Sequence, residues 1–121
     1  MYRTLVADDD FLVRSYLKTL DSWEKAGYEI VDDAEDGEEA YGFLQKEKID
    51  VLVTDLTMPV MDGIQATEKI RTISLSVPII AVTAYAFYTE QQQAIQAGCN
   101  AVISKPYSVE KLRETIESYI G

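Results

Sequence analysis

The sequence contains no histidine and only one cysteine, Cys99. Without histidine, a Ser-His-Asp triad, a histidine-ligated zinc site and general-base catalysis by imidazole are all excluded. A single cysteine cannot form an internal disulfide, and it lacks the partners for a thiolate metal site. Any chemistry in this chain must therefore use oxygen and amine groups.

Basic residues are also scarce, with 11 against 21 acidic residues and a net charge of −10. This balance argues against direct binding of nucleic acid, which needs clustered Lys and Arg. No apolar run approaches the roughly 20 residues of a membrane span. The first residues, 1–4, lead straight into a short apolar run and then into acids, which is not the pattern of a signal peptide. We expect no membrane contact and a cytoplasmic location.

The 121 residues, 47% of them hydrophobic, predict one domain over 1–121 with a core of its own. Short apolar runs alternate with amphipathic segments five times along the chain. Strands are expected at 4–7, 28–31, 49–55, 78–83 and 101–104. Helices are expected at 11 to about 25, after 37, from 63 to about 72, at about 87–97, and from 108 onward. Such alternation predicts an α/β fold with a parallel sheet and helices on both faces.

Polar side chains stand where four of these strands end. Asp55 closes the run VLVTD, Thr83 closes PIIAVT, and Lys105 follows AVIS. The first strand runs into three acids, Asp8, Asp9 and Asp10. The carboxyl ends of parallel strands share one edge of the sheet, where open α/β folds bind ligands. We therefore expect an acid cluster, a hydroxyl and one cation around a single point, with Asp10 serving as a helix cap.

This acid cluster needs a cation. Two carboxylates about 4 Å apart repel each other by roughly 4 kcal/mol at an effective dielectric constant near 20. Oxygen ligands without histidine or cysteine favour Mg²⁺. A carboxylate can also act as a nucleophile toward phosphorus, and Mg²⁺, an ammonium and a hydroxyl can stabilise the incoming phosphoryl group.

The set of motifs resembles the receiver domain of two-component response regulators over essentially the whole chain. It consists of Asp8-Asp9, Asp55 within DLTMPVMDG, Thr83-Ala84 after PIIAV, and Lys105-Pro106 after AGCNAVIS. The resemblance implies a flavodoxin-like (βα)5 fold with strand order 2-1-3-4-5. The stretch LDSWEKAGYEIVDDAEDGEEA is similar to receivers of AraC-type regulators, whereas 78–120 is similar to receivers of hybrid histidine kinases.

The same resemblance implies a role for each motif residue. Asp55 would accept the phosphoryl group, Thr83 would hydrogen-bond it and Lys105 would pair with it. Asp8, Asp9 and Asp55 would bind Mg²⁺, together with the backbone carbonyl of Thr57. The donor would be the phosphohistidine of a histidine kinase or phosphotransfer protein, so the chain would be a signalling switch and not a classical enzyme.

Two positions bear on how such a switch would work. The family usually has an aromatic residue three positions before the lysine, and here that position holds Val102. The aromatic ring that usually couples to the threonine is therefore missing here. We also hypothesise that Tyr85, two residues after Thr83, shields the acyl phosphate from water. Phosphorylation is expected to change the face formed by residues 87–120, a face that receivers use for homodimers and other partners.

Three other functions compete with this one. A haloacid-dehalogenase-like phosphatase would need a second Asp two residues after Asp55, where this sequence has Thr57. A flavodoxin-like FMN carrier would need a hydroxyl- and Gly-rich loop after the first strand, where three acids would repel phosphate. A pseudo-receiver that only binds proteins is the third alternative.

Overall fold

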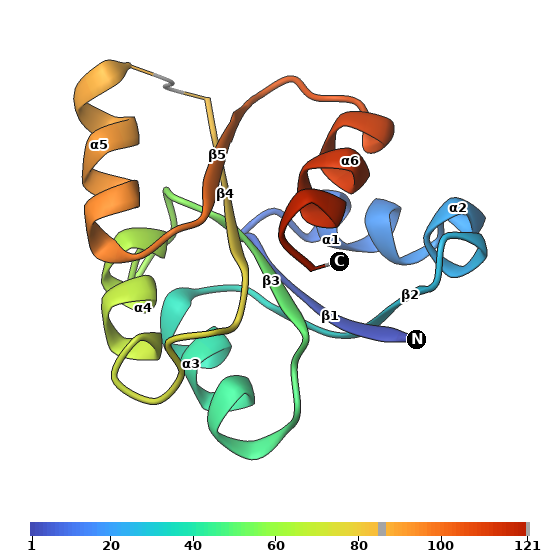
Figure 1. Cartoon of the computed structure of the whole chain (residues 1–121), viewed down its shortest axis with the longest axis horizontal. Coiled ribbons are helices and arrows are strands. Elements are labelled where there is room, and N and C mark those ends of the chain that lie inside the picture. The colour runs from blue at the N-terminus through green and yellow to red at the C-terminus, as the bar shows by residue number, and fades with distance from the viewer. Residues whose placement is uncertain (85–86, 121) are drawn as a thin grey trace.

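The structure is a computed structural model of the chain, and it describes residues 1–84 and 87–120. Its elements follow in this order: β1 (Tyr2–Ala7), α1 (Phe11–Lys18), α2 (Asp21–Lys25), β2 (Tyr28–Ala34), α3 (Gly37–Lys46), β3 (Val51–Asp55), α4 (Gly63–Ile70), β4 (Ile79–Thr83), α5 (Tyr88–Ala97), β5 (Ala101–Ser104) and α6 (Val109–Ile120). The strands form one parallel sheet in the order β2-β1-β3-β4-β5 (Figure 1). The predicted fold class and strand order are confirmed.

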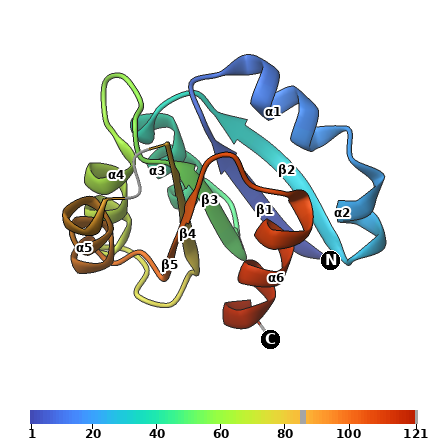
Figure 2. The same cartoon turned by 90° about the horizontal axis from the view of Figure 1, so that it is seen from above.

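The sheet separates two layers of helices (Figure 2), and one hydrophobic core lies on each of its faces. On one face α3, α4 and α5 pack against the strands, and Ala40, Ile70 and Ala94 are fully buried there. On the other face lie α1, α2 and α6, whose buried side chains include Leu17 and Leu112. Because β3 and β4 are covered on both faces, every one of their residues is buried, as the continuous apolar runs predict.

The first predicted helix, 11 to about 25, is wrong, because two helices occupy this segment. α1 ends at Lys18, where the hydroxyl of Thr19 donates to the carbonyl of Tyr16 at 2.9 Å and Leu20 takes an extended conformation. A continuous helix would place Trp23 about 80° from Val13 and about 60° from Leu20, at the margin of the apolar stripe. The break turns the Trp23 indole into the core, edge-on to Tyr28 with 5.8 Å between ring centroids.

The second strand was predicted to stop at Val31, with an acidic connection after it, and this is also wrong. β2 continues to Ala34, and its register against β1 shifts so that Leu5 pairs with Asp32 and Val6 with Asp33. The strand can hold the Asp33 carboxylate because two cations from α1 bind it, as described below. An acidic sequence is therefore compatible with an edge strand once its charge is paired.

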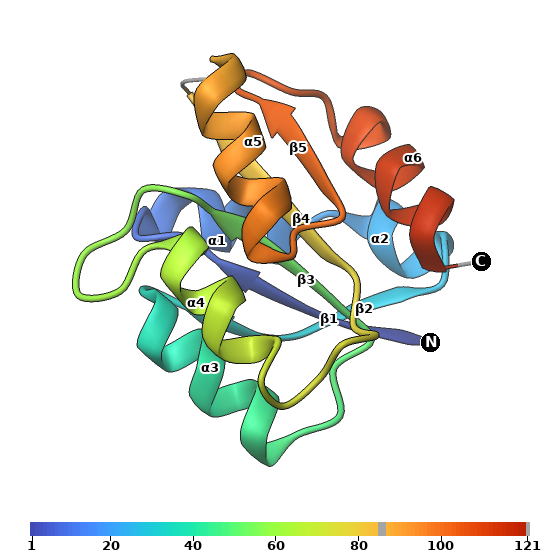
Figure 3. The same ribbon diagram turned by 60° about the vertical axis from the view of Figure 1, so that its left-hand side comes forward.

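The segment after α4 differs from its prediction as well. The helix ends at Ile70 and not near residue 72, and Ile73 beyond it is 46% exposed. Arg71 explains the ending, because its guanidinium donates to the carbonyl oxygens of Ser74, Val77 and Gly98 at 2.7 to 3.1 Å. α4 and α5 lie side by side on this face (Figure 3).

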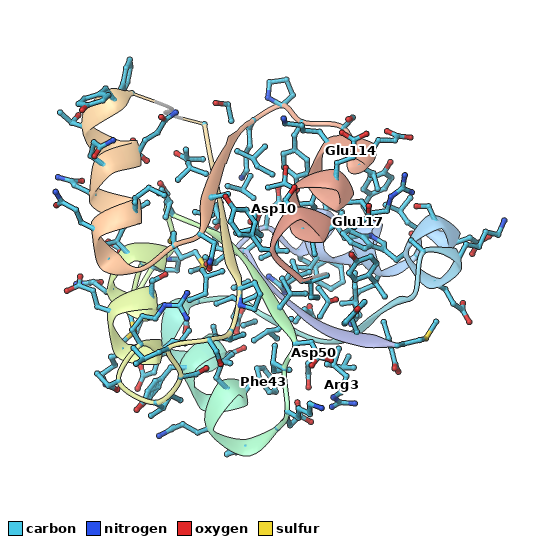
Figure 4. The ribbon with its side chains drawn as sticks, viewed as in Figure 1. Arg3, Asp10, Phe43, Asp50, Glu114 and Glu117 are labelled. Carbon is cyan, nitrogen blue, oxygen red and sulfur yellow. The ribbon has the colours of Figure 1, made fainter. Side chains whose placement is uncertain are left out.

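The amino edge of the sheet, where the parallel strands begin, has other contacts than the carboxyl edge, where they end. At the amino edge, Asp50 accepts from the backbone N–H of Arg3 at 2.8 Å and donates its own N–H to the Arg3 carbonyl at 2.7 Å. Figure 4 shows Arg3 and Asp50 together at this edge, with Asp10 at the opposite, carboxyl edge. These two hydrogen bonds join Arg3 on β1 to Asp50 just before β3 at the amino edge, whereas the predicted site residues lie at the carboxyl edge.

Candidate functional site

Four strand ends bring the predicted site residues together at the carboxyl edge. Asp8 directly follows β1, Asp55 ends β3, Thr83 ends β4 and Lys105 follows β5. Asp8, Asp55 and Thr83 are buried, with at most 8% of each residue exposed. Polar side chains are rarely buried in this way unless they have partners, so the contacts of each one indicate what the site does.

Asp8, Asp9 and Asp55 form the predicted acid cluster. Each offers a carboxylate oxygen, and these three oxygens lie within 4.8 Å of one another. Asp9 is exposed, which leaves the cluster open to solvent on one side. Burial raises the pKa of Asp8, an effect that a hydrogen bond from the Asp10 N–H and the charge of Lys105 only partly offset. The raised pKa shows that the fold bears a cost for keeping this carboxylate charged.

Lys105 supplies the cation of the cluster. Its Nζ lies 3.0 Å from Oδ2 of Asp55 and 3.6 Å from Oδ2 of Asp8, and its side chain is 30% exposed. Burial lowers the pKa of Lys105, but the hydrogen bond and charge of Asp55 and the charge of Asp8 outweigh burial, so the net shift is upward. The peptide bond between Lys105 and Pro106 is cis.

The backbone around Asp55 fixes its carboxylate at the strand end. The N–H of Leu56 donates to the carbonyl of Val82 at 3.0 Å, and Gly63 donates its N–H to the Leu56 carbonyl at 3.1 Å. The Thr57 N–H donates to Oδ1 of Asp55 at 3.1 Å. A side chain at Gly63 would meet the carbonyl oxygen of Asp55 at 2.5 Å, so glycine is needed for α4 to begin this close to β3.

Oxygen-only donors of this kind fit a hard divalent ion. Asp8, Asp9 and Asp55 provide three carboxylates within reach of one ion, and the chain offers no imidazole that would favour zinc. Thr57, the predicted carbonyl ligand, lies two residues after Asp55 and is exposed. The three carboxylates suit Mg²⁺ better than a softer metal. The ammonium of Lys105 lies beside one of them, that of Asp55.

Thr83 reaches the site, but its hydroxyl has a partner that the sequence did not predict. It donates to Oε1 of Glu90 on α5 at 2.8 Å. From the sequence, Glu90 is only one residue of the helix expected at about 87–97. The signal that could have found it is an acid in the first turn of the helix that follows a strand-end hydroxyl.

Arg14 is the second residue that sequence reasoning missed. It interrupts the apolar stretch FLVRSYL, is 9% exposed, and donates from Nη1 to the Asp8 carbonyl at 2.6 Å. An arginine inside an apolar run just after the acid cluster was the available signal. Val102, in place of the usual aromatic, is half-buried against the core under α3, α4 and α5. Tyr85 lies outside the described residues.

Among the residues that the structure describes, no helix combines the length and the apolar character needed to cross a membrane.

Sequence comparison connects this chain to signalling proteins. A family profile described as "Response regulator receiver domain" matches residues 4–117. The sensor histidine kinase RcsC of Escherichia coli is 36% identical over 115 residues, which cover 95% of this chain but only 12% of that protein. The transcriptional regulatory protein PdtaR of Mycobacterium tuberculosis is also 36% identical over 115 residues, which cover 95% of this chain and 55% of that protein. The matched proteins are thus of two kinds, a sensor kinase and a transcriptional regulator, and this chain is shorter than both.

Structural comparison gives the same result. The response regulator TrrA of Thermotoga maritima, solved in complex with Mg²⁺-BeF, has a TM-score of 0.85 and 30% identity over 98% of this chain and 99% of that one. A CheX-CheY-BeF3-Mg complex from Borrelia burgdorferi has a TM-score of 0.88 and 27% identity over 97% of this chain and 87% of that one. Since the family profile runs through nearly the whole chain, and relatives at 36% identity cover almost all of it, the chain belongs to the response regulator receiver domain family.

Proposed function

We propose that this domain, over residues 1–121, is a phosphorylation-dependent switch that accepts a phosphoryl group on Asp55. Receiver domains are signalling domains and not classical enzymes. The observation that carries the proposal is the arrangement around Asp55. Its carboxylate is paired with Lys105 at 3.0 Å and shares an oxygen cluster with Asp8 and Asp9. Lys105 and the Thr57 N–H hold this carboxylate in place, and the exposed Asp9 leaves the cluster open to solvent on one side.

The transfer itself needs little chemistry from the chain. A carboxylate oxygen of Asp55 attacks phosphorus, the bond from phosphorus to the donor histidine nitrogen breaks, and that nitrogen keeps the electron pair and takes up a proton. Lys105 balances the negative charge that the phosphoryl group brings. The Thr83 hydroxyl donates to a phosphoryl oxygen once it has left Glu90. Asp8, Asp9, Asp55 and the Thr57 carbonyl would hold Mg²⁺, which would neutralise charge on the phosphoryl oxygens.

The donor would be the phosphohistidine of a histidine kinase or of a phosphotransfer protein. The match to the receiver domain family and to a sensor histidine kinase supports this part of the proposal. The output would be a change in the face formed by α5, β5 and α6, which then controls an output module, a partner or a homodimer. The acidic net charge of −10 supports an absence of direct nucleic acid binding. The cytoplasmic location belongs to the same proposal.

Intact mass spectrometry after incubation with acetyl phosphate and Mg²⁺ tests the proposal. The wild type should gain one phosphoryl adduct, and Asp55→Asn should gain none. Asp10→Asn is the matched control, because Asp10 lies at the same edge but only caps α1, which asparagine can also do. It should be phosphorylated like the wild type. A wild type without an adduct would leave the protein-binding pseudo-receiver as the better explanation.

A further inference from the structure

Arg14 is a buried cation next to the acid cluster that the proposed phosphoryl transfer does not use. It lies on α1 and is 9% exposed. Its guanidinium makes two hydrogen bonds to different elements: Nη1 donates to the backbone carbonyl of Asp8 at 2.6 Å, and Nε donates to Oδ2 of Asp33 at 2.7 Å. Arg14 therefore connects the end of β1 to β2 through one rigid, planar group.

The contact to Asp8 completes the set of hydrogen bonds that fixes this residue. Its N–H donates to the carbonyl of Ala34 at 2.9 Å, and its Oδ1 accepts from the N–H of Asp10 at 2.9 Å. Arg14 fixes the carbonyl. With both backbone groups and one carboxylate oxygen fixed, Oδ2 of Asp8 is held toward the cluster, 3.6 Å from Nζ of Lys105.

Asp33 in turn holds Arg14. It is paired with Val6 in the sheet, and its other oxygen, Oδ1, accepts from Nζ of Lys18 at 2.9 Å. Lys18 and Arg14 therefore bind the same carboxylate, but of these two cations only Arg14 has a hydrogen bond to Asp8 among the described residues. Lys18 offers a natural comparison for separating the charge of Arg14 from its contact with Asp8.

We propose that Arg14 is a positioning residue for the Mg²⁺ site, acting through the Asp8 carbonyl. This inference rests on the proposed function, because it requires that Asp8 binds the ion. Groups that orient a metal ligand from behind commonly change metal affinity by 10- to 100-fold when they are removed. Arg14 plays this part from α1, with Asp33 as its anchor on β2.

The charge of Arg14 and its contact with Asp8 predict opposite changes in Mg²⁺ affinity when Arg14 is replaced. Arg14 is a cation near an acid cluster, so its charge alone repels Mg²⁺, and its removal should tighten Mg²⁺ binding. If Arg14 positions Asp8, its removal should instead weaken Mg²⁺ binding. The direction of the change therefore distinguishes a positioning role from a purely electrostatic one.

The test is isothermal titration with MgCl2 of the wild type, Arg14→Met, Arg14→Lys and Lys18→Met. We expect Arg14→Met to bind Mg²⁺ about tenfold more weakly than the wild type. Lys18→Met loses the same charge beside Asp33 and should bind as tightly as the wild type or more tightly. Arg14→Lys keeps the charge but has one nitrogen in place of two separated ones, so it should also bind more weakly.

Each possible result supports or overturns either the positioning role of Arg14 or the metal site itself. Equal or tighter binding by Arg14→Met than by Lys18→Met overturns the positioning role. If circular dichroism shows that Arg14→Met does not fold, Arg14→Lys against Lys18→Met decides in the same way. A wild type that binds no Mg²⁺ would instead overturn the metal site of the proposed function, so the two failures are distinguishable.

Discussion

The hydroxyl of Thr83 donates a hydrogen bond to Oε1 of Glu90 at 2.8 Å, which links the end of β4 to the first turn of α5. Thr83 is fully buried, whereas Glu90 stands at the third position of its helix, where a carboxylate also interacts favourably with the helix dipole. A hydroxyl has one proton to donate. A phosphoryl group on Asp55 and the Glu90 carboxylate would therefore compete for it.

We predict that Glu90→Ala makes phosphorylation of Asp55 easier. Removing the competing acceptor saves the cost of breaking the Thr83 hydrogen bond, about 1 kcal/mol, which corresponds to about a fivefold faster gain of the adduct. The rate of adduct formation with acetyl phosphate, followed by mass spectrometry, measures this. Glu114→Ala, which removes an exposed carboxylate from α6, is the control and should react at the wild-type rate. A Glu90→Ala rate equal to that of Glu114→Ala would contradict the prediction.

The Thr83–Glu90 contact also explains which part of the site the sequence could predict. One rule predicts that the site residues lie close together: parallel strands end at a common edge of the sheet, however their helices pack. It covers Asp8, Asp55, Thr83 and Lys105. The partners of these residues do not follow from it. Glu90 meets Thr83 only because α5 starts close to β4, and that approach depends on packing between elements that the sequence does not reveal.

The departures in the fold have the same cause. The strand pattern was sufficient for an α/β fold with a parallel sheet, since the β3 and β4 runs are short and continuously apolar. The order of the strands came from the resemblance to receiver domains. The break after Lys18 and the extension of β2 to Ala34 depend instead on tertiary contacts, namely the turn of Trp23 onto Tyr28 and the ion pairs of Asp33. Local propensity carries no information about either contact.

We predict that the same substitution at two glycines has opposite effects. Gly63→Ala should destabilise the fold by about 2 kcal/mol, because the new methyl group meets the Asp55 carbonyl oxygen at 2.5 Å and the Leu56 Cα at 3.0 Å. Gly42→Ala, inside α3 with nothing within 4 Å of a Cβ, should stabilise it by about 0.5–1 kcal/mol. Urea unfolding of both variants measures the difference. Equal effects would show that α4 can move away from β3 at little cost.

Val60 is a β-branched residue with a positive φ of 64°, in the loop between β3 and α4. The N–H of Met61 donates to the carbonyl of Pro59 across it at 2.6 Å, which makes a tight three-residue turn. Its side chain is 76% exposed, so little packing is lost on substitution. We predict that Val60→Gly raises the free energy of unfolding by about 1 kcal/mol, by relieving strain. Val60→Ala, which keeps a Cβ, is the control and should gain less; a higher melting temperature for Val60→Ala than for Val60→Gly would contradict the explanation.

Mg²⁺ should stabilise the wild type by mass action, by about 2.7 kcal/mol at a free concentration 100 times its dissociation constant. Asp9→Asn should abolish this gain. Asp9 is exposed and its charge adds to the repulsion on Asp8, so its removal should leave the metal-free protein as stable as the wild type or more so. Melting temperatures with MgCl2 and with EDTA measure both effects. A rise with Mg²⁺ in Asp9→Asn equal to that of the wild type would place the ion elsewhere.

The ion pairs of Asp33 make a prediction about acid stability. Burial raises the pKa of Asp33, but the hydrogen bonds from Lys18 and Arg14 outweigh burial, so the folded pKa lies below the ordinary value of 3.8. A carboxylate with a lowered folded pKa contributes stability above its unfolded pKa, about 3.9, and this contribution is lost as the pH falls through the folded value. The affected window is therefore below about pH 4.

We predict that Asp33→Asn lowers the free energy of unfolding by about 1 kcal/mol at pH 7 and makes its decline below pH 4 shallower than in the wild type. Urea unfolding across this range measures both effects. Asp32→Asn is the control, because the neighbouring Asp32 forms no ion pair within the described part of the chain, and its acid decline should match that of the wild type. If the two variants declined alike, the Asp33 carboxylate would not be held by Arg14 and Lys18 in solution, and the anchor proposed for Arg14 would be lost with it.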